Sequence, residues 1–302
     1  MDNNQTILIT GGAGFIGSHC AELFFKHGYN VIVADNLSTG NLENANIATK
    51  FYNIDINSPD FELIFKENKI DYVLHLAAQS DVTFSRKSPI IDADENILGS
   101  INVFSLSKKY NVKKIIVAST AAVYGTPEYL PIDETHTIAP LSFYGLSKYT
   151  MEQYLKLFDI DYIIFRFANV YGERQNPHGE AGVVAIFVDK MCHNEDIEIT
   201  GDGEQTRDFV YVKDVAQICL LGFKSDVKNE IVNVSTNSGI TINDLFLKIA
   251  DVLKYNKEPV HIEDRFDDIK HSVLNNEKCF ELFNFTLQTS LDEGIANIIK
   301  WR

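Results

Sequence analysis

Tyr144 and Lys148, four positions apart in the sequence, form a pair that could move a proton. Residues at this spacing lie on one face of a helix, so the phenol and the ammonium would point the same way. A phenol with its usual pKa of about 10 is a poor base at neutral pH, and a nearby positive charge favours the phenolate. This spacing also occurs by chance where a surface helix begins. The residues that precede the pair therefore decide between a catalytic pair and an ordinary helix start.

Two hydroxyl side chains, Ser119 and Thr120, follow an apolar run that we predict to be a strand over Lys114–Ala118. Ligands of open parallel sheets bind at the carboxyl ends of the strands, so these hydroxyls would lie beside a substrate. We select Thr120 as the group that hydrogen-bonds the reacting oxygen, with Ser119 as the nearest alternative. Thr120, Tyr144 and Lys148 are therefore the predicted catalytic residues.

A glycine-rich segment follows the first predicted strand, and it reads Gly11-Gly12-Ala13-Gly14-Phe15-Ile16-Gly17. Glycines let the backbone approach a pyrophosphate, whose charge is stabilised by the N–H groups of the next helix. Glycine clusters also form plain turns, but Asp35 at the end of the second predicted strand completes a dinucleotide-binding pattern, because its carboxylate can bind an adenosine ribose. No Lys or Arg lies between Asp35 and Ala48, so a 2′-phosphate would meet no cation and NAD is favoured over NADP.

Further contacts with NAD are predicted where the next strands end. Asp55 could bind an adenine amino group while Ile56 packs on the ring, although Asp55 fits a helix-capping role almost equally well. Small residues after the fourth strand leave room for the cofactor to lie across the sheet. The other predicted contacts are Asn36, Ser38, Thr39, Gly40, Leu76, Ala77, Ala78, Gln79 and Asn96.

To position these residues, the ends of several strands must meet at one edge of a sheet. Apolar β-branched runs alternate with amphipathic stretches over residues 1–170, which predicts an α/β fold with a doubly wound parallel sheet of the Rossmann type. The predicted strands are Thr6–Thr10, Asn30–Ala34, Lys50–Asn53, Tyr72–Leu76, Lys114–Ala118 and Tyr162–Phe167, and the predicted helices are Ile16–His27, Pro59–Asn68, Ile90–Tyr110 and Tyr144–Leu157.

The pattern becomes irregular after residue 170. We expect an NAD-binding domain over residues 1–170 and a smaller α/β substrate-binding lobe over residues 171–302, with one segment crossing back between them. For the lobe we predict a helix over Val183–Cys192, a hairpin-like segment over Ile197–Tyr211, a helix from Lys213 and a strand near Glu230–Val234.

Charge and cysteine content exclude several classes of protein. The 302 residues carry 27 Lys and Arg against 42 Asp and Glu, a net charge of −15, which argues against nucleic-acid or anionic-membrane partners. No apolar run approaches the roughly 20 residues that span a bilayer, and we find no signal peptide. The four cysteines stand apart, without the clustered ligands of a zinc site, so we predict no metal and a reducing, cytoplasmic location.

The glycine loop, Asp35, the two hydroxyls and the Tyr144/Lys148 pair, in this order, resemble the extended short-chain dehydrogenase/reductase family. The resemblance covers nearly the whole chain. Three later segments, 166–172, 201–212 and 265–272, are similar to the branch of that family that modifies nucleotide sugars.

This resemblance implies a UDP-sugar substrate. Its diphosphate would be bound by Asn169, Arg207 and Arg265, and its uridine ribose by Asp268. Planar guanidinium groups suit phosphate oxygens, although each arginine alone fits a surface ion pair equally well. The full predicted substrate set is Ser80, Thr120, Tyr144, Asn169, Val184, Arg207, Arg265, Asp268 and Ser272.

The residues after Thr120 separate the activities of the family. Its dehydratases and some decarboxylases carry an acid next to this hydroxyl or two places beyond, where this chain has Ala121 and Ala122. The resemblance therefore implies a UDP-hexose 4-epimerase, in which Tyr144 and the cofactor, with its positive nicotinamide ring, perform the whole reaction. UDP-glucuronate epimerisation or decarboxylation, dTDP-sugar dehydration and a non-catalytic NAD-sensing role remain as alternatives.

Ser272 bears on which sugar is bound. In the 4-epimerases a bulky tyrosine at one position limits substituents at C2 of the sugar, and the offset from Arg265 and Asp268 places Ser272 there. The resemblance thus implies activity on UDP-GlcNAc and UDP-GalNAc as well as on UDP-glucose and UDP-galactose. Phe266 and Asp267 depart from a usual Pro-Gly, which puts the geometry of this loop in doubt.

Family members often form homodimers through two helices. The candidates here are Ile90–Tyr110 and Tyr144–Leu157, and a homodimer is our expectation. Their apolar stripes fit an internal core equally well.

Overall fold

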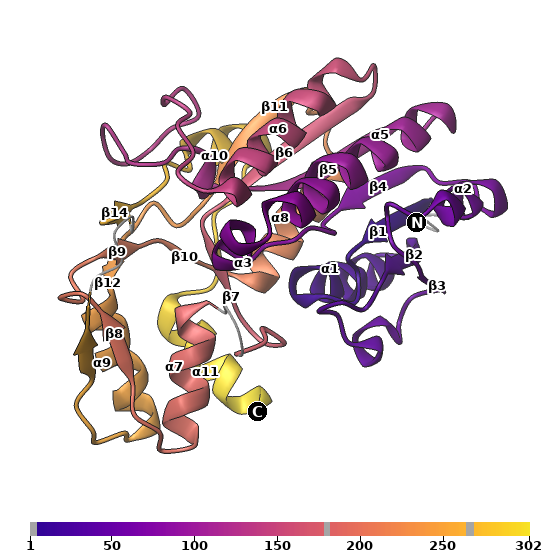
Figure 1. Ribbon diagram of the computed structural model, residues 1–302. Coiled ribbons are helices and arrows are strands. Elements are labelled where there is room, and N and C mark those ends of the chain that lie inside the picture. The colour runs from indigo at the N-terminus through magenta and orange to yellow at the C-terminus, as the bar shows by residue number, and fades with distance from the viewer. Residues whose placement is uncertain (1–4, 178–181, 264–268) are drawn as a thin grey trace.

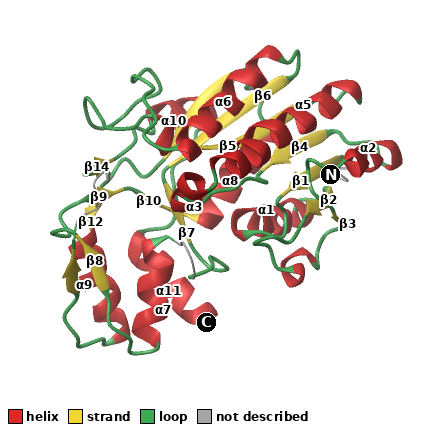
Figure 2. Cartoon of the chain, in the orientation of Figure 1, coloured by secondary structure: helices red, strands yellow, loops and turns green. Residues whose placement is uncertain are grey.

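A parallel β-sheet forms the centre of the larger lobe (Figures 1 and 2). The computed structural model describes residues 5–177, 182–263 and 269–302, and within these ranges the sheet has seven strands in the order β11-β6-β5-β4-β1-β2-β3. Neighbouring strands are parallel throughout, which confirms the predicted fold class. The strands are β1 (Thr6–Thr10), β2 (Asn30–Asp35), β3 (Lys50–Asn53), β4 (Tyr72–His75), β5 (Lys114–Thr120), β6 (Asp161–Phe167) and β11 (Glu230–Val234).

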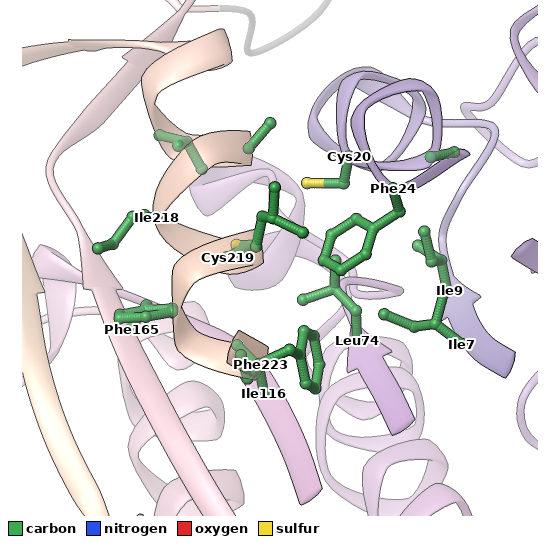
Figure 3. Packing of buried hydrophobic residues seen from close by; sticks show 14 of the residues in the cluster. Ile7, Ile9, Cys20, Phe24, Leu74, Ile116, Phe165, Ile218, Cys219 and Phe223 are labelled. Carbon is green, nitrogen blue, oxygen red and sulfur yellow. The ribbon is translucent and has the colours of Figure 1, made fainter. Parts of the chain in front are cut away.

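Helices cover both faces of this sheet, and strand residues alternate between the two resulting cores. Ile7 and Ile9 pack on the face where Phe24 and Phe223 meet edge to face, with ring centroids 5.7 Å apart (Figure 3). Leu8 packs on the opposite face. Burial on both faces explains why the strand sequences are almost continuously apolar. The first face is covered by α1 (Phe15–Lys26) and α8 (Val212–Lys224), and the second by α2 (Glu62–Glu67), α5 (Gly99–Lys109) and α6 (Phe143–Leu157).

The strand order reverses at β1, because β2 and β3 lie on one side of it and β4, β5 and β6 on the other. In open α/β sheets this reversal leaves a crevice at the carboxyl ends of the strands, where ligands bind. The chain returns to the sheet after residue 170, since α8 packs against α1 and β11 pairs with β6. The sheet layer thus contains segments from both sides of residue 170.

The smaller lobe has its own apolar core, separate from the two cores of the sheet, and three helices contribute to it. These helices are α7 (Val183–Cys192), α9 (Ile242–Leu253) and α11 (Leu291–Trp301). Seven short strands pair among themselves in three small sheets that are separate from the large one: β7 (Asn169–Tyr171), β8 (Glu198–Thr200), β9 (Thr206–Arg207), β10 (Phe209–Tyr211), β12 (Ile240–Thr241), β13 (Val260–Ile262) and β14 (His271–Ser272).

The predicted hairpin over Ile197–Tyr211 is wrong. Its three short strands pair with other segments: β8 with β13, β9 with β12 and β14, and β10 with β7. Glycines with positive φ, Gly201 (67°) and Gly203 (75°), turn the chain between β8 and β9 without bringing these two strands together. The partners lie far along the chain, so the local pattern of apolar residues does not reveal them.

The predicted helix Ile90–Tyr110 is interrupted. It consists of α4 (Pro89–Ala93), a π-helical turn η3 (Asp94–Leu98) and α5, and it is preceded by an unpredicted helix, α3 (Val82–Lys87). The remaining elements are the 3₁₀ turns η1 (Leu42–Ala45), η2 (Pro59–Phe61) and η4 (Ala121–Val123) and the helix α10 (Glu277–Phe283). Over the residues described, we find no helix with the length and apolar character to span a bilayer.

Candidate active site

A cavity of about 440 Å³ lies along the carboxyl ends of β1, β2, β4, β5 and β6. It gathers residues that the sequence assigned to cofactor, catalysis and substrate. Those lining it are Gly11, Gly14, Phe15, Ile16, Gly17, Asp35, Asn36, Ser38, Thr39, Asp55, Ile56, Leu76, Ala77, Ala78, Ser80, Thr120, Tyr144, Lys148, Asn169 and Val184. The strand reversal at β1 therefore brings three predicted sets of residues to one place.

The glycine loop after β1 has no room for side chains. Gly11 has a φ of +68°, and a Cβ there would lie 2.7 Å from the backbone nitrogen of Ala77. A Cβ on Gly17 would lie 2.1 Å from the Gly11 carbonyl oxygen. With glycines at these positions, the backbone N–H groups that open α1 border the cavity directly, which suits the pyrophosphate of a dinucleotide.

Asp35 ends β2 and holds the glycine loop in place. Its Oδ2 accepts a hydrogen bond from the Ala13 N–H at 3.0 Å, and its Oδ1 accepts one from the Leu37 N–H at 2.8 Å. Gly40, a predicted cofactor contact, is not among the lining residues, and a Cβ there would lie 2.9 Å from Asp35 Oδ1. The glycine loop, Asp35 and the cavity together fit NAD.

The first turn of α6 presents Tyr144 and Lys148 to the cavity. Ser142 caps this helix by accepting a 3.0 Å hydrogen bond from the Gly145 N–H. Thr120, where β5 ends, hydrogen-bonds the Tyr144 side chain. Thr120 and Tyr144 both line the cavity, so the hydroxyl and the phenol lie next to each other at its wall.

Burial dominates the protonation of this pair. It raises the pKa of Tyr144 to about 12, and the hydrogen bond with Thr120 only partly opposes this shift. Burial also lowers the pKa of Lys148 to about 8, against the negative charges of Glu152 and Asp92. The protein by itself therefore does not produce the phenolate that we expected Lys148 to favour, because desolvation outweighs the attraction. The positive charge of an oxidised nicotinamide would act in the required direction.

Ser119, the alternative to Thr120, has its hydroxyl bound elsewhere. It donates a 2.5 Å hydrogen bond to Glu152 Oε1. Glu152 in turn forms a bidentate ion pair with Arg166, at 2.6 Å and 3.0 Å, and their side chains are 0% and 2% exposed. Although Ser119 borders the cavity, its proton is committed to this buried ion pair, so Thr120 is the hydroxyl that faces Tyr144.

Two predicted cofactor contacts, Gln79 and Asn96, lie outside the cavity lining. Both are buried and bind each other, the Gln79 N–H donating to Asn96 Oδ1 at 2.9 Å and Asn96 Nδ2 donating to the Gln79 carbonyl at 2.9 Å. Their amides also donate to the buried Asp92. The structure therefore places them in a buried polar cluster around Asp92.

The predicted substrate residues are only partly brought together. Asn169 Nδ2 donates to the Asp208 carbonyl at 3.1 Å, and Asn169 lines the cavity. Arg207 and Ser272 lie outside the lining but form a register pair between β9 and β14. Arg265 and Asp268 fall outside the residues that the structure describes.

Several cavity residues were not predicted from the sequence. They are Ala34, Ile54, Glu95, Ala118, Phe167, Ala168, Val170, Tyr171, Gln175, Gly182, Val183 and Phe209. One rule could have found some of them, since Ala34, Ala118 and Phe167 lie at the carboxyl ends of strands. The described part of the chain contains no cluster of His, Cys, Asp and Glu that could hold a metal ion.

The fold and this site define an enzyme of the dinucleotide-dependent Rossmann class, with a Tyr–Lys pair and a hydroxyl next to the cofactor loop. The chain belongs to the NAD dependent epimerase/dehydratase family, whose model matches residues 7–235.

Relatives and solved structures agree with this assignment. The putative UDP-glucose 4-epimerase of Methanocaldococcus jannaschii is 45% identical over 300 residues, which cover 98% of this chain and 97% of the relative. The crystal structure of a UDP-glucose 4-epimerase from Thermotoga maritima with UDP-glucose has a TM-score of 0.95 at 42% identity and covers 98% of both chains. A UDP-N-acetylglucosamine 4-epimerase from Methanobrevibacter ruminantium, in complex with UDP-N-acetylmuramic acid, has a TM-score of 0.94 at 34% identity and covers 99% of this chain and 98% of its own.

Proposed function

We propose that this chain is an NAD-dependent 4-epimerase of UDP-hexoses. The observation that carries the proposal is that Tyr144 and Thr120 lie next to each other at the wall of the cavity that the glycine loop borders. The relatives named above, at 42% and 45% identity over almost the whole chain, support the same activity.

The acids of the cavity support epimerisation over elimination. Among the described lining residues the carboxylates are Asp35, Asp55 and Glu95. We assign Asp35 and Asp55 to the adenosine, as the sequence predicts, and the pKa of Glu95 is raised by burial and by the charges of Asp55, Asp94 and Asp92, so none of the three is assigned to the sugar. The residues after Thr120, Ala121 and Ala122, form the turn η4 and carry no group that could move a second proton.

In the proposed reaction Tyr144, as the phenolate, accepts the proton of the sugar 4-hydroxyl, while Thr120 hydrogen-bonds the same oxygen. NAD, held by the glycine loop and Asp35, would supply hydride transfer from C4 and back to it on the other face of the sugar, so no net oxidation would result. The 4-keto sugar stays held through its diphosphate, by Asn169, Arg207 and Arg265, while the hexose ring turns over. Tyr144 then gives the proton back to the 4-oxygen.

Ser272 supports a wider substrate range. It stands beside Arg207 in the register of β14 and β9, and its small side chain leaves space where a tyrosine would not. We therefore extend the proposal to UDP-GlcNAc and UDP-GalNAc, an activity named for one of the similar structures.

We further propose that the protein is a homodimer and acts in the cytoplasm. Apolar side chains are exposed along α4, η3 and α6, with Ile90 and Leu157 each 83% exposed, and an unpaired apolar face of this kind favours a partner. The patch consists of Ile90, Ile91, Leu98, Phe143, Leu146, Tyr154 and Leu157. A reducing compartment fits the four free cysteines.

The proposal is tested by incubating the purified protein with each UDP-sugar separately, with no NAD added, and separating the products. The proposed activity predicts interconversion of 4-epimers, and Tyr144→Phe is the matched inactive control. Release of NADH, or of carbon dioxide from UDP-glucuronate, would instead identify an oxidoreductase or a decarboxylase. Failure with every UDP-sugar by a protein that binds NAD would support the NAD-sensing alternative.

A further inference from the structure

Asp92 is a buried acid on α4 that the reaction described above does not use. Asp92 is only 1% exposed, although the neighbouring Ile90 and Ile91 are exposed. Its Oδ1 accepts hydrogen bonds from Gln79 Nε2 at 2.9 Å and from Asn96 Nδ2 at 3.2 Å. Two N–H donors directed at one oxygen are typical of an ionised carboxylate.

Hydrogen bonds connect Asp92 to the helical turn that carries the catalytic pair. Asn96 Nδ2 also donates to Ser147 Oγ at 3.0 Å, and Ser147 Oγ donates to the carbonyl oxygen of Tyr144 at 3.0 Å. Burial raises the pKa of Asp92, and the hydrogen bonds around it and the Lys148 charge oppose this shift. The π-helical turn η3, a feature often found at functional sites, begins two residues after Asp92 and supplies Asn96.

Charge connects Asp92 to the same pair. Burial lowers the pKa of Lys148, and the negative charges of Glu152 and Asp92 act to raise it. The charge of Glu152 is matched by the bidentate Arg166, whereas the donors to Asp92 Oδ1 are neutral amides. The negative charge of Asp92 therefore acts on Lys148 with less compensation.

The other titratable groups near this pair do not replace Asp92. His75 on β4 is neutral at physiological pH, because burial, together with the Lys148 charge, lowers its pKa to about 3. Glu95 is the second residue of η3, and its pKa is raised by burial and then by the charges of Asp55, Asp94 and Asp92, so it does not add a fixed negative charge in the way that Asp92 does. Tyr144 is itself protonated when its pKa is about 12.

We propose that Asp92 is a positioning residue for the Tyr144–Lys148 pair: it holds the first turn of α6 through Asn96 and Ser147 and keeps the Lys148 ammonium charged. The inference deepens the proposed function and rests on it, because a charged Lys148 matters where it must stabilise a phenolate and bind the cofactor. Asp92 itself is not among the residues that line the cavity, so it acts through its neighbours.

The test is a pH titration of Lys148 in the NAD-loaded protein, followed by NMR of ¹³C-labelled lysine and assigned by the signal lost in Lys148→Arg. Asp92→Asn removes the charge and keeps the shape, and Asp94→Asn, two residues along and exposed, is the matched control. We expect Asp92→Asn to lower the Lys148 pKa by roughly one pH unit, as a unit charge within about 10 Å does at an effective dielectric constant of about 20. We expect Asp94→Asn to leave it unchanged.

The kinetic readout is the pH profile of kcat, whose alkaline limb should move to lower pH in Asp92→Asn by the same amount. A merely structural role would lower kcat without moving this limb. If Asp92→Asn does not fold, Asp92→Ser removes the charge and leaves a hydroxyl acceptor for Asn96, and it provides the same comparison.

A Lys148 titration unchanged by loss of the Asp92 charge overturns the inference. A wild-type protein that converts no UDP-hexose overturns the proposed function instead, and the NMR titration distinguishes the two failures.

Discussion

The Ser119 hydroxyl donates a 2.5 Å hydrogen bond to Glu152, which commits the first of two adjacent hydroxyls to a buried ion pair. The next residue, Thr120, hydrogen-bonds Tyr144 instead. Successive side chains of a strand point to opposite faces, so one strand end supplies both a structural and a catalytic hydroxyl. This division makes the two residues a natural matched pair.

Thr120→Ala and Ser119→Ala should therefore fail in different ways. We expect Thr120→Ala to lower kcat about 100-fold, because a donor to the reacting oxygen is lost. We expect Ser119→Ala to leave kcat nearly unchanged and to lower the free energy of unfolding by about 1 kcal/mol, the usual net effect of one hydrogen bond. Steady-state kinetics and chemical denaturation measure the two effects, and the reverse pattern would assign catalysis to Ser119.

The ion pair between Arg166 and Glu152 is predicted to matter strongly for stability. Arg166→Met leaves the Glu152 carboxylate buried without its cation, and we expect a loss of about 3–5 kcal/mol in the free energy of unfolding. Lys228→Met removes the cation of a surface pair with Asp161, whose side chains are 58% and 41% exposed, and serves as the control. The control should lose less than about 1 kcal/mol. Equal losses in the two variants, measured by denaturant unfolding, would contradict the account.

Asp35 is predicted to control NAD affinity through the loop that it holds. In Asp35→Asn the amide must turn a donor toward the N–H of either Ala13 or Leu37, so one of these two hydrogen bonds is lost. We expect the Kd for NAD to rise about tenfold, the effect of one lost hydrogen bond. Calorimetric titration with NAD measures this change, with the exposed Asp60→Asn as a control that should bind like the wild type.

Asp208 should make the folded state less stable as pH rises. Its carboxyl is 0% exposed, and burial raises its pKa to about 6, against hydrogen bonds to Oδ1 from Thr236 at 2.9 Å and 2.6 Å. Because the folded-state pKa is above the usual value of about 3.9, the contribution to stability is present at low pH and is lost as pH rises through about 6. The loss amounts to up to about 3 kcal/mol.

Asp208→Asn removes this titration. Denaturant unfolding between pH 4 and pH 7 should show the wild type losing stability relative to the variant as pH rises. Parallel curves for the two proteins would contradict the assigned pKa shift.

The sequence predicted those parts of the fold that depend on local pattern. Strands β1 and β3 begin and end where expected, because their residues are extended runs bounded by clear turns. The glycine loop and Asp35 were recognisable because phosphate binding at a helix N-terminus demands fixed spacing. These features need no knowledge of distant contacts.

The sequence predicted less where distant contacts decide the outcome. The strand pairs of the smaller lobe join segments such as β8 and β13, some 60 residues apart, and their order cannot be read from a short window. Asn96, predicted to bind NAD, also donates from its amide to the buried Asp92, a contact that the sequence did not show. The pKa of Tyr144 likewise depends on desolvation, which the four-residue spacing to Lys148 does not show.

The most direct test of the central claim follows one hydrogen atom. UDP-glucose carrying deuterium at C4 is incubated with the protein in ordinary water, without added NAD, and the UDP-galactose that forms is analysed by mass spectrometry and NMR. Hydride transfer to a bound cofactor and back predicts that deuterium remains at C4 of the product. Formation of UDP-galactose with hydrogen at C4, or no UDP-galactose at all, would contradict 4-epimerisation through a 4-keto sugar held in this site.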